Sequence, residues 1–218
     1  MIISDKKKFV FIHIPKTGGT SIENSLLKYA NFRQKIVSYY PTKYLIYLIN
    51  RSNINLLDNG NKWINGFHRH EKICFLEKDK KYNNYFIFTF VRNPYEWFLS
   101  LYNYIKRSKN HKDYQIVKDM NLKIFLDYII EKKFYIQSDY IYSNKYEKKI
   151  NFIGKLENMN NDFNFILKKL KINSKLNHKN KSYNNTCNEI LFHDKKFLNK
   201  FNDYFNKDFL NFGYEPVN

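Results

Sequence analysis

Residues 9–23 read FVFIHIPKTGGTSIE, and this stretch predicts the centre of the fold. Its first part is a run of apolar, partly β-branched residues, which is typical of a buried strand. The adjacent glycines Gly18 and Gly19 then indicate a turn. Thr20 with Glu23 three residues later has the form of a capping box, which predicts a helix that begins here and runs to about residue 29. A strand, a glycine-rich turn and a helix start aim backbone N–H groups and the positive end of a helix dipole at an anion.

Lys16 adds a positive charge at the edge of this turn, so the stretch predicts a loop that holds phosphate or sulfate. A Walker A loop is not indicated, because that pattern places its Lys after the last Gly and follows it with Ser or Thr. Lys16 instead precedes Gly18 and Gly19. The alternative explanation is a tight turn that uses glycine only for its positive φ. A proline, a lysine and hydroxyl side chains between a strand and a helix favour the anion-binding loop.

The length and composition favour a single domain over residues 1–218 with a substantial core. Aromatic residues make up 19% of the chain, which disfavours wholesale disorder. The two cysteines, Cys74 and Cys187, do not suggest a disulfide framework and predict a reducing compartment. No apolar run is long enough to cross a bilayer, and a first strand at Phe9 leaves no room for a signal peptide. We therefore expect a soluble, cytoplasmic protein.

The formal net charge is +18, from 38 basic and 20 acidic side chains. Such a field attracts polyanions such as nucleic acid, an anionic membrane or an acidic polysaccharide. The lysines are scattered singly or in short runs, and heavy use of Lys, Asn, Ile and Tyr throughout indicates a biased coding composition as a further explanation. Charge alone therefore selects no partner.

A second strand and helix are predicted where residues 85–91, an apolar run, lead into Arg92-Asn93-Pro94. Asn93 suits the N-cap of a helix and Pro94 suits its first position. Ser100 lies about two turns into this helix. Arg92 stands at the carboxyl end of the strand, which is where ligands bind in open α/β sheets.

The remaining pattern predicts strands that alternate with helices, and therefore an α/β fold with a parallel sheet covered on both faces. Residues 44–49 fit a strand or a core helix, and residues 58–61 indicate a turn. The further expected elements are a helix over 121–133, a strand over 151–154, a helix capped by Asn158 or Asn160 and continuing to 170, a loop over 173–188 and a helix over 194–205.

With these elements placed, the sequence resembles the carbohydrate-type, Golgi-like sulfotransferases that use 3′-phosphoadenosine 5′-phosphosulfate (PAPS), here without a membrane anchor. Residues 11–21, FIHIPKTGGTS, are similar to that family's 5′-phosphosulfate loop, and residues 90–104, FVRNPYEWFLSLYNY, to its 3′-phosphate segment. Weaker similarities lie at 137–139, 152–163, 180–182 and 208–214. The resemblance implies a P-loop-like sulfotransferase fold and an activity of the EC 2.8.2 type.

The resemblance also implies roles for the matching residues. Arg92 and Ser100 would bind the 3′-phosphate of the donor, and PAP would be the product. The 5′-phosphosulfate would be held by Lys16, Thr17, Gly18, Gly19, Thr20 and Ser21. No metal is expected, since the His-x-His pair at 68–70 lacks an obvious third ligand.

Catalysis is expected to follow in-line displacement, with Lys16 stabilising the charge that grows on the leaving oxygen. A histidine general base would take the proton of the acceptor hydroxyl. His68 is the first candidate, because the family commonly has a histidine in this region, and His70 is the second. Glu71 or Glu157 remain alternatives as the base or as the group that orients the histidine.

Two other functions fit parts of the sequence. A P-loop nucleotide kinase or phosphotransferase would need a Walker A lysine and a magnesium-binding Asp after an apolar strand. A basic nucleic-acid-binding module would use the net charge but leaves both anion loops unexplained. We expect a carbohydrate acceptor and no nucleic-acid partner, with a tyrosine or a lipid-linked glycan as open alternatives. The oligomeric state is not predicted.

Overall fold

The structure is a computed structural model that describes residues 1–31, 34–35, 70–78, 80–142, 150–176 and 194–217. Its centre is a four-stranded sheet in the order β1-β2-β3-β4. The strands are β1 (Ile2–Ser4), β2 (Phe9–Ile12), β3 (Phe86–Val91) and β4 (Phe152–Lys155). The strands β2, β3 and β4 are parallel, which confirms the predicted α/β class with a parallel sheet. The edge strand β1 is antiparallel to β2 and was not predicted.

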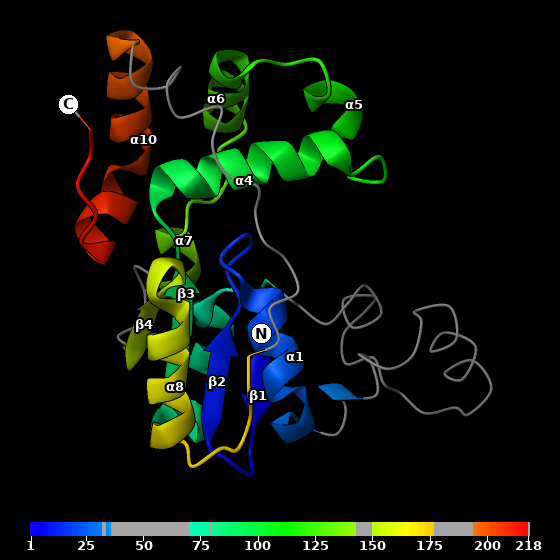
Figure 1. The fold of residues 1–218 in the computed structure, drawn as a ribbon, viewed down its shortest axis with the longest axis vertical. Coiled ribbons are helices and arrows are strands. Elements are labelled where there is room, and N and C mark those ends of the chain that lie inside the picture. The colour runs from blue at the N-terminus through cyan, green and yellow to red at the C-terminus, as the bar shows by residue number, and fades with distance from the viewer. Residues whose placement is uncertain (32–33, 36–69, 79, 143–149, 177–193, 218) are drawn as a thin grey trace.

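The described helices and 3₁₀ turns connect and cover these strands (Figure 1). They are α1 (Gly19–Leu26), η1 (Leu27–Tyr29), η2 (Ile73–Lys78), η3 (Lys80–Asn84), α4 (Pro94–Arg107), α5 (Tyr114–Val117), α6 (Leu122–Glu131), α7 (Ser138–Ile141), η4 (Leu156–Asn158), α8 (Met159–Lys169) and α10 (Lys195–Phe212).

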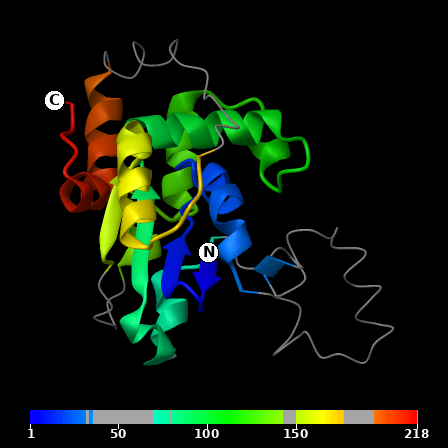
Figure 2. The same ribbon diagram turned by 60° about the horizontal axis from the view of Figure 1, so that its bottom comes forward.

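Alternating side chains along the strands bury both faces of the sheet, as the period of two requires. One face carries phenylalanines from β2 and β3, which pack against α1 and α8. Figure 2 shows these two helices beside the sheet. The other face carries smaller aliphatic residues, which pack against η2, η3 and α7. The first group includes Phe9, Phe11, Phe88 and Phe90, and the second includes Val10, Ile12, Ile87 and Val91. The sheet is therefore held rigidly enough to position whatever follows its carboxyl ends.

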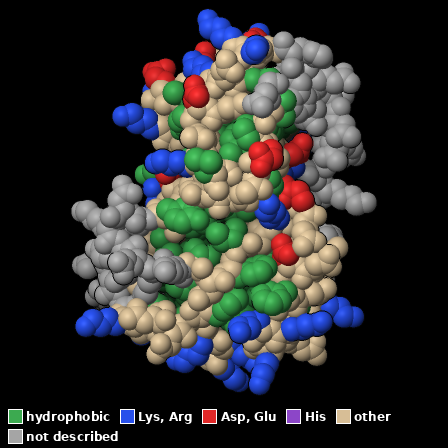
Figure 3. Space-filling view, turned by 90° about the vertical axis from the view of Figure 1, so that its left-hand side faces the viewer, with side chains coloured by type: hydrophobic (Ala, Val, Ile, Leu, Met, Phe, Trp, Pro, Cys, Tyr) green, Lys and Arg blue, Asp and Glu red, His purple; other side chains and the backbone are tan. Residues whose placement is uncertain are grey.

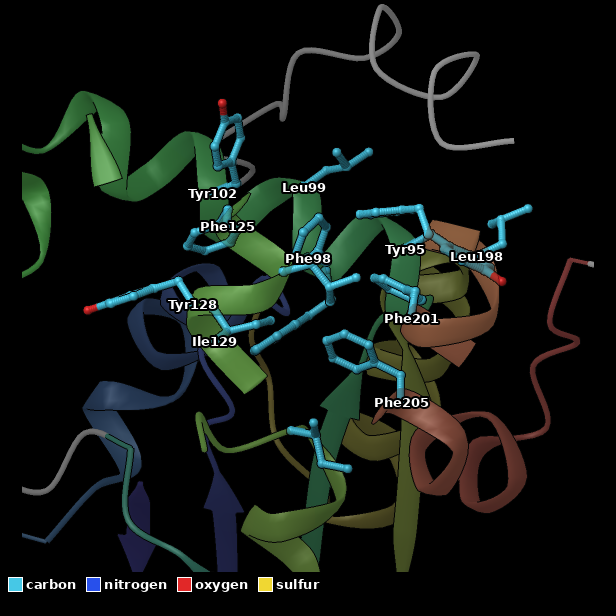
Figure 4. Packing of buried hydrophobic residues seen from close by; sticks show 14 of the residues in the cluster. Tyr95, Phe98, Leu99, Tyr102, Phe125, Tyr128, Ile129, Leu198, Phe201 and Phe205 are labelled. Carbon is cyan, nitrogen blue, oxygen red and sulfur yellow. The ribbon is translucent and has the colours of Figure 1, made fainter. Parts of the chain in front are cut away.

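A separate layer of helices, α4, α6 and α10, lies across the carboxyl end of the sheet (Figure 1). Phe98 of α4 is at its centre, with its ring centroid 5.3 Å from those of Phe125 and Phe201 (Figure 4). Phe201 in turn stacks on Phe205, with centroids 4.4 Å apart. This aromatic cluster fixes α4, and with it the turn that leads from β3 into α4.

The start of α1 corrects one prediction. Gly18, with φ of 77°, is the N-cap, and among the described residues no side chain caps this helix. The capping box predicted for Thr20 and Glu23 is therefore wrong. Glu23 turns instead toward His13, whose Nδ1 lies 2.8 Å from its Oε1. A buried partner from another segment has replaced the local cap.

The start of α4 is as predicted. The Asn93 side chain accepts a hydrogen bond from the Tyr95 N–H at 3.0 Å, and Pro94 occupies the first helical position. The end of α10 is not as predicted, since this helix continues seven residues past 205 to Phe212 and ends at Gly213 with φ of 60°. The predicted helix stopped early because Asp208 interrupts the apolar pattern of the sequence. In the structure Asp208 lies within α10 and is buried, as is Phe209.

The predicted elements over 44–49 and 58–61, most of the loop over 173–188, the similarity at 180–182, His68 and Cys187 lie outside the described residues. Within the described part of the chain, no helix combines the length and the apolar character needed to cross a bilayer. Figure 3 shows the side with β4, α8 and the C-terminal tail, where Lys and Arg side chains are dispersed rather than joined in one stripe. On this face the positive charge does not form a single binding patch.

Candidate active site

Residues 13–18 form the turn between β2 and α1. We call it the donor loop, because the sequence resemblance predicts that it contacts the sulfuryl donor. Lys16 and Gly18 both have left-handed backbones, with φ of 65° and 77°. The Thr17 hydroxyl is fully buried and donates to the Ile14 carbonyl at 2.9 Å, so this side chain braces the loop from inside. A Cβ at Gly18 would lie 2.7 Å from Leu156, so the loop packs closely against the segment after β4. The glycine-rich turn predicted from the sequence is thus closely packed by its own Thr17 side chain and by Leu156.

His13, the first residue of the donor loop, was not singled out as a site residue by the sequence analysis. It is buried at 3% exposure, and its Nδ1 faces Glu23 at 2.8 Å. A Cβ at Gly19 would lie 2.0 Å from the His13 ring, so the first residue of α1 must be glycine for the ring to fit. The signal in the sequence was a histidine inside an otherwise apolar run, together with a Glu one turn into the helix.

Gly19→Ala is expected to lower the free energy of unfolding by about 3 kcal/mol, because the added methyl group overlaps the buried His13 ring. Urea denaturation measures the change. Gly213→Ala is the matched control. Its φ is 60°, but among the described residues beyond its own chain neighbours no atom lies within 4 Å of the added Cβ, so only backbone strain of about 1 kcal/mol is expected. Equal losses in the two variants would contradict the crowding at Gly19.

Arg92 and Asn93 form the second turn, between β3 and α4. Arg92 is 7% exposed, and its Nη2 lies 2.9 Å from Glu96 Oε2 one helical turn along α4. This pairing of a buried guanidinium with a carboxylate holds the Arg92 side chain along the start of α4. A planar donor group of this kind suits a phosphate or a carboxylate.

The two turns lie next to each other because β2 and β3 are neighbouring parallel strands, with Ile12 paired to Thr89. The Thr89 hydroxyl donates to the Ile12 carbonyl at 2.8 Å. Trp97 of α4 donates its indole N–H to the Pro15 carbonyl at 2.7 Å, which ties the donor loop to the helix after Arg92. The turns that follow the two strands are therefore held side by side.

The positive charges of the two turns, on Lys16 and Arg92, are close enough to repel each other. Lys16 Nζ lies 4.2 Å from the centroid of the Tyr104 ring on α4. Burial lowers the pKa of the Lys16 ammonium, and the positive charges of Arg92 and Arg107 lower it further. Cations that repel one another across a site are stabilised when an anion lies between them. An anion bound here would raise the pKa of Lys16 again.

Ser100 is half-buried on α4, one turn before Tyr104. Residues four apart share a helix face, so Ser100 lies on the same side of α4 as the ring that contacts Lys16. The structure therefore brings Lys16, Arg92 and Ser100 to one region. Their roles in binding a nucleotide stay predictions.

The model of the Sulfotransferase family matches residues 1–215, nearly the whole chain. The chain belongs to the sulfotransferase family. Comparison with curated proteins and with solved structures found no match. Family membership supports sulfuryl transfer, a reaction of the EC 2.8.2 type, to a hydroxyl-bearing acceptor.

His70 of this sulfotransferase packs beside the donor loop. Its Nδ1 donates to the His13 carbonyl at 2.9 Å, because a carbonyl oxygen can only accept. The neutral ring therefore carries its proton on Nδ1 and keeps Nε2 as the acceptor. His70 as a whole residue is exposed, but the atoms packed around its ring shield the ring from water. This burial lowers the pKa of His70 to about 4, and the neighbouring His13 lowers it by a smaller amount. The ring is thus uncharged at neutral pH.

The two glutamates considered as alternatives lie in different settings. Glu71 is half-buried beside His70 in the chain. Glu157 accepts hydrogen bonds from the Asn93 N–H at 2.7 Å and from the Tyr214 hydroxyl at 2.9 Å. Glu157 therefore supports the turn after β3, and both of its oxygens are engaged there.

An open hollow of about 620 Å³ adjoins the candidate site at the carboxyl end of α4. Tyr104 lines it and is 45% exposed, so one ring borders both this hollow and Lys16. The other lining residues are Arg107, Ser108, Lys109, Asn110, His111 and Lys112. The hollow offers an aromatic surface and several positive charges to a molecule that approaches Lys16.

Proposed function

We propose that this sulfotransferase moves a sulfuryl group from PAPS to a hydroxyl group, most directly one on a carbohydrate. The observation that carries the proposal is the convergence of two cations, Lys16 and Arg92, which follow neighbouring parallel strands. Burial lowers the pKa of Lys16, and the positive charge of Arg92 lowers it further. A nucleotide with phosphate at both its 3′ and 5′ positions suits two such anion sites. The crowded glycines at the end of the donor loop and the start of α1, Gly18 and Gly19, fit a backbone cradle for the 5′-phosphosulfate.

The proposed chemistry is an in-line displacement at sulfur. The acceptor oxygen forms the new S–O bond while the bond to the 5′-phosphate oxygen breaks, and that oxygen keeps the electron pair. Lys16 would stabilise this growing negative charge, and the donor loop would hold the group in line. The acceptor's proton passes to a base. No metal is needed in this scheme, and activity in the presence of EDTA would check that prediction.

We assign the base to His70, because the hydrogen bond to the His13 carbonyl leaves Nε2 as its acceptor. His70→Gln is expected to lower kcat by about 10²–10⁴-fold. Because the pKa of His70 is about 4, the unaltered ring stays neutral as the pH falls from 8 to 5 and loses its acceptor only near pH 4. The acid limb of the kcat/KM profile should therefore lie near pH 4 rather than near 6.5, the ordinary histidine value.

His68→Gln is the matched variant, since it removes a histidine two residues away. Full activity in His68→Gln together with a loss in His70→Gln supports the assignment. A loss confined to His68→Gln moves the base to that residue. Full activity in both variants contradicts a histidine base.

A carbohydrate acceptor is supported by the exposed Tyr104 ring between Lys16 and the hollow, since sugar rings stack on aromatic faces. The proposed function is tested by calorimetry with PAP and with a random oligonucleotide, followed by transfer from radiolabelled PAPS to a panel of glycans, peptides and lipids. Tight binding of PAP and labelling of glycans support the proposal. If the protein bound the oligonucleotide but not PAP, the proposal would be overturned. If only peptides or only lipids were labelled, the proposed carbohydrate acceptor would be wrong.

A further inference from the structure

One side chain holds both main-chain polar groups of Arg92. Gln137 accepts a hydrogen bond from the Arg92 N–H at 2.8 Å, and its own Nε2 donates to the Arg92 carbonyl at 2.8 Å. Gln137 is fully buried and lies 45 residues further along the chain, just before α7. An amide that pairs with both groups of one residue acts as a neighbouring strand would, and it fixes the backbone where β3 ends.

Gln137 is itself held by Asp208 of α10. Asp208 Oδ2 accepts from the Gln137 N–H at 3.0 Å and from Gln137 Nε2 at 3.4 Å, and Oδ1 accepts from the Ser138 N–H at 2.7 Å. Asp208 is fully buried, and that burial raises the pKa of its carboxyl group. A buried carboxylate is costly unless it is hydrogen-bonded, so three N–H donors on its two oxygens indicate a position that the fold defines closely.

A second support reaches the same turn from the tail that follows α10. Glu157 accepts from the Asn93 N–H at 2.7 Å, and the Tyr214 hydroxyl donates to the other oxygen of Glu157 at 2.9 Å. Lys155 donates to the Gly213 carbonyl at 3.1 Å, which fastens the end of α10 to β4. The C-terminal end of α10 lies beside β4 in both ribbon views (Figures 1 and 2). Two consecutive residues, Arg92 and Asn93, are therefore held by side chains anchored to α10 and its tail.

We propose that Gln137 and Glu157, anchored by Asp208 and Tyr214, are positioning residues for the 3′-phosphate site, so that α10 and its tail set where Arg92 meets the donor. This inference rests on the proposed function, because it takes Arg92 as the residue that contacts the 3′-phosphate. The hydrogen bonds of Gln137 and Glu157 described above go to the backbone of the turn after β3, and none of them goes to the donor loop after β2. Their loss should therefore weaken recognition of the 3′-phosphate and spare recognition of the 5′-phosphate.

The test compares two nucleotides by calorimetry: PAP, and adenosine 5′-phosphate, which lacks the 3′-phosphate. Gln137→Met keeps the length of the side chain and removes both hydrogen bonds to Arg92. We expect PAP to bind about tenfold more weakly while binding of adenosine 5′-phosphate does not change, because a displaced charged group loses most of its directed contacts. Asp208→Asn should act in the same direction, since either orientation of the amide places an NH₂ group against an N–H donor.

Asp203→Asn is the control for Asp208→Asn, because Asp203 is exposed on the same helix and the charge change is identical. Tyr214→Phe is a milder variant that keeps the aromatic ring and removes only the hydroxyl on Glu157. Its expected effect is a loss of about threefold in PAP affinity alone, the size of one hydrogen bond. Circular dichroism confirms that each variant is folded before binding is measured.

The outcomes separate this inference from the proposed function. A loss confined to PAP in Gln137→Met, or in Tyr214→Phe if the first variant does not fold, supports the positioning role. Equal losses for both nucleotides, or no loss, would overturn it and leave these residues a purely structural role. If the unaltered protein showed no preference for PAP over adenosine 5′-phosphate, the proposed function would fail first and the inference with it.

Discussion

Lys16→Ala is expected to lower kcat by about 10²–10³-fold, the usual effect of removing a group that stabilises charge in the transition state. Lys16 is the cation of the donor loop, and burial together with Arg92 and Arg107 lowers its pKa. Its ammonium therefore gains most when negative charge grows beside it, at the moment the 5′-phosphate oxygen leaves. Initial rates with radiolabelled donor, at saturating concentrations of both substrates, measure the effect. Affinity for PAP should fall much less than kcat.

Two comparisons make the Lys16 result specific. Lys6→Ala removes an exposed lysine from the turn after β1 and should leave the rate unchanged. Lys16→Arg keeps the positive charge but replaces a compact ammonium with a planar group, and it should recover little activity because the Tyr104 ring lies 4.2 Å from the Lys16 nitrogen. A fall in PAP affinity as large as the fall in kcat would contradict a role in the transition state.

Arg92→Ala is expected to weaken PAP binding by about 100-fold, since truncation of one partner in a buried charged pair commonly costs this much. Binding of adenosine 5′-phosphate should not change, because that nucleotide has no 3′-phosphate for Arg92 to contact. With donor at saturation, kcat should be nearly unchanged. Calorimetry with the two nucleotides and steady-state rates give the three values.

Arg107→Ala is the matched control for Arg92→Ala. Arg107 also lowers the pKa of Lys16, but it is exposed and lines the hollow at the far end of α4. Its removal should leave the ratio of the two nucleotide affinities as it is. An equal loss of PAP and adenosine 5′-phosphate binding in Arg92→Ala would show that Arg92 does not contact the 3′-phosphate.

The sequence by itself determined the two strand–turn–helix units that form the candidate site. An apolar run, a glycine-rich turn and a helix start predicted β2, the donor loop and α1. The pair Asn93-Pro94 after a second apolar run predicted the turn from β3 into α4. These predictions succeeded because strand periodicity, helix caps and glycine turns depend on residues close together in the chain. The order of the two motifs was also enough to suggest the sulfotransferase family, which the match over residues 1–215 confirms.

Only the tertiary structure decided the supports around those elements. Glu23 has the spacing of a capping residue but pairs with the buried His13, and the apolar pattern of α10 breaks at Asp208 although the helix continues. The contacts from Gln137 to Arg92 and to Asp208 span 45 and 71 residues. A buried polar group finds its partner through the packing of segments distant in the chain, and no local pattern of residues records that pairing.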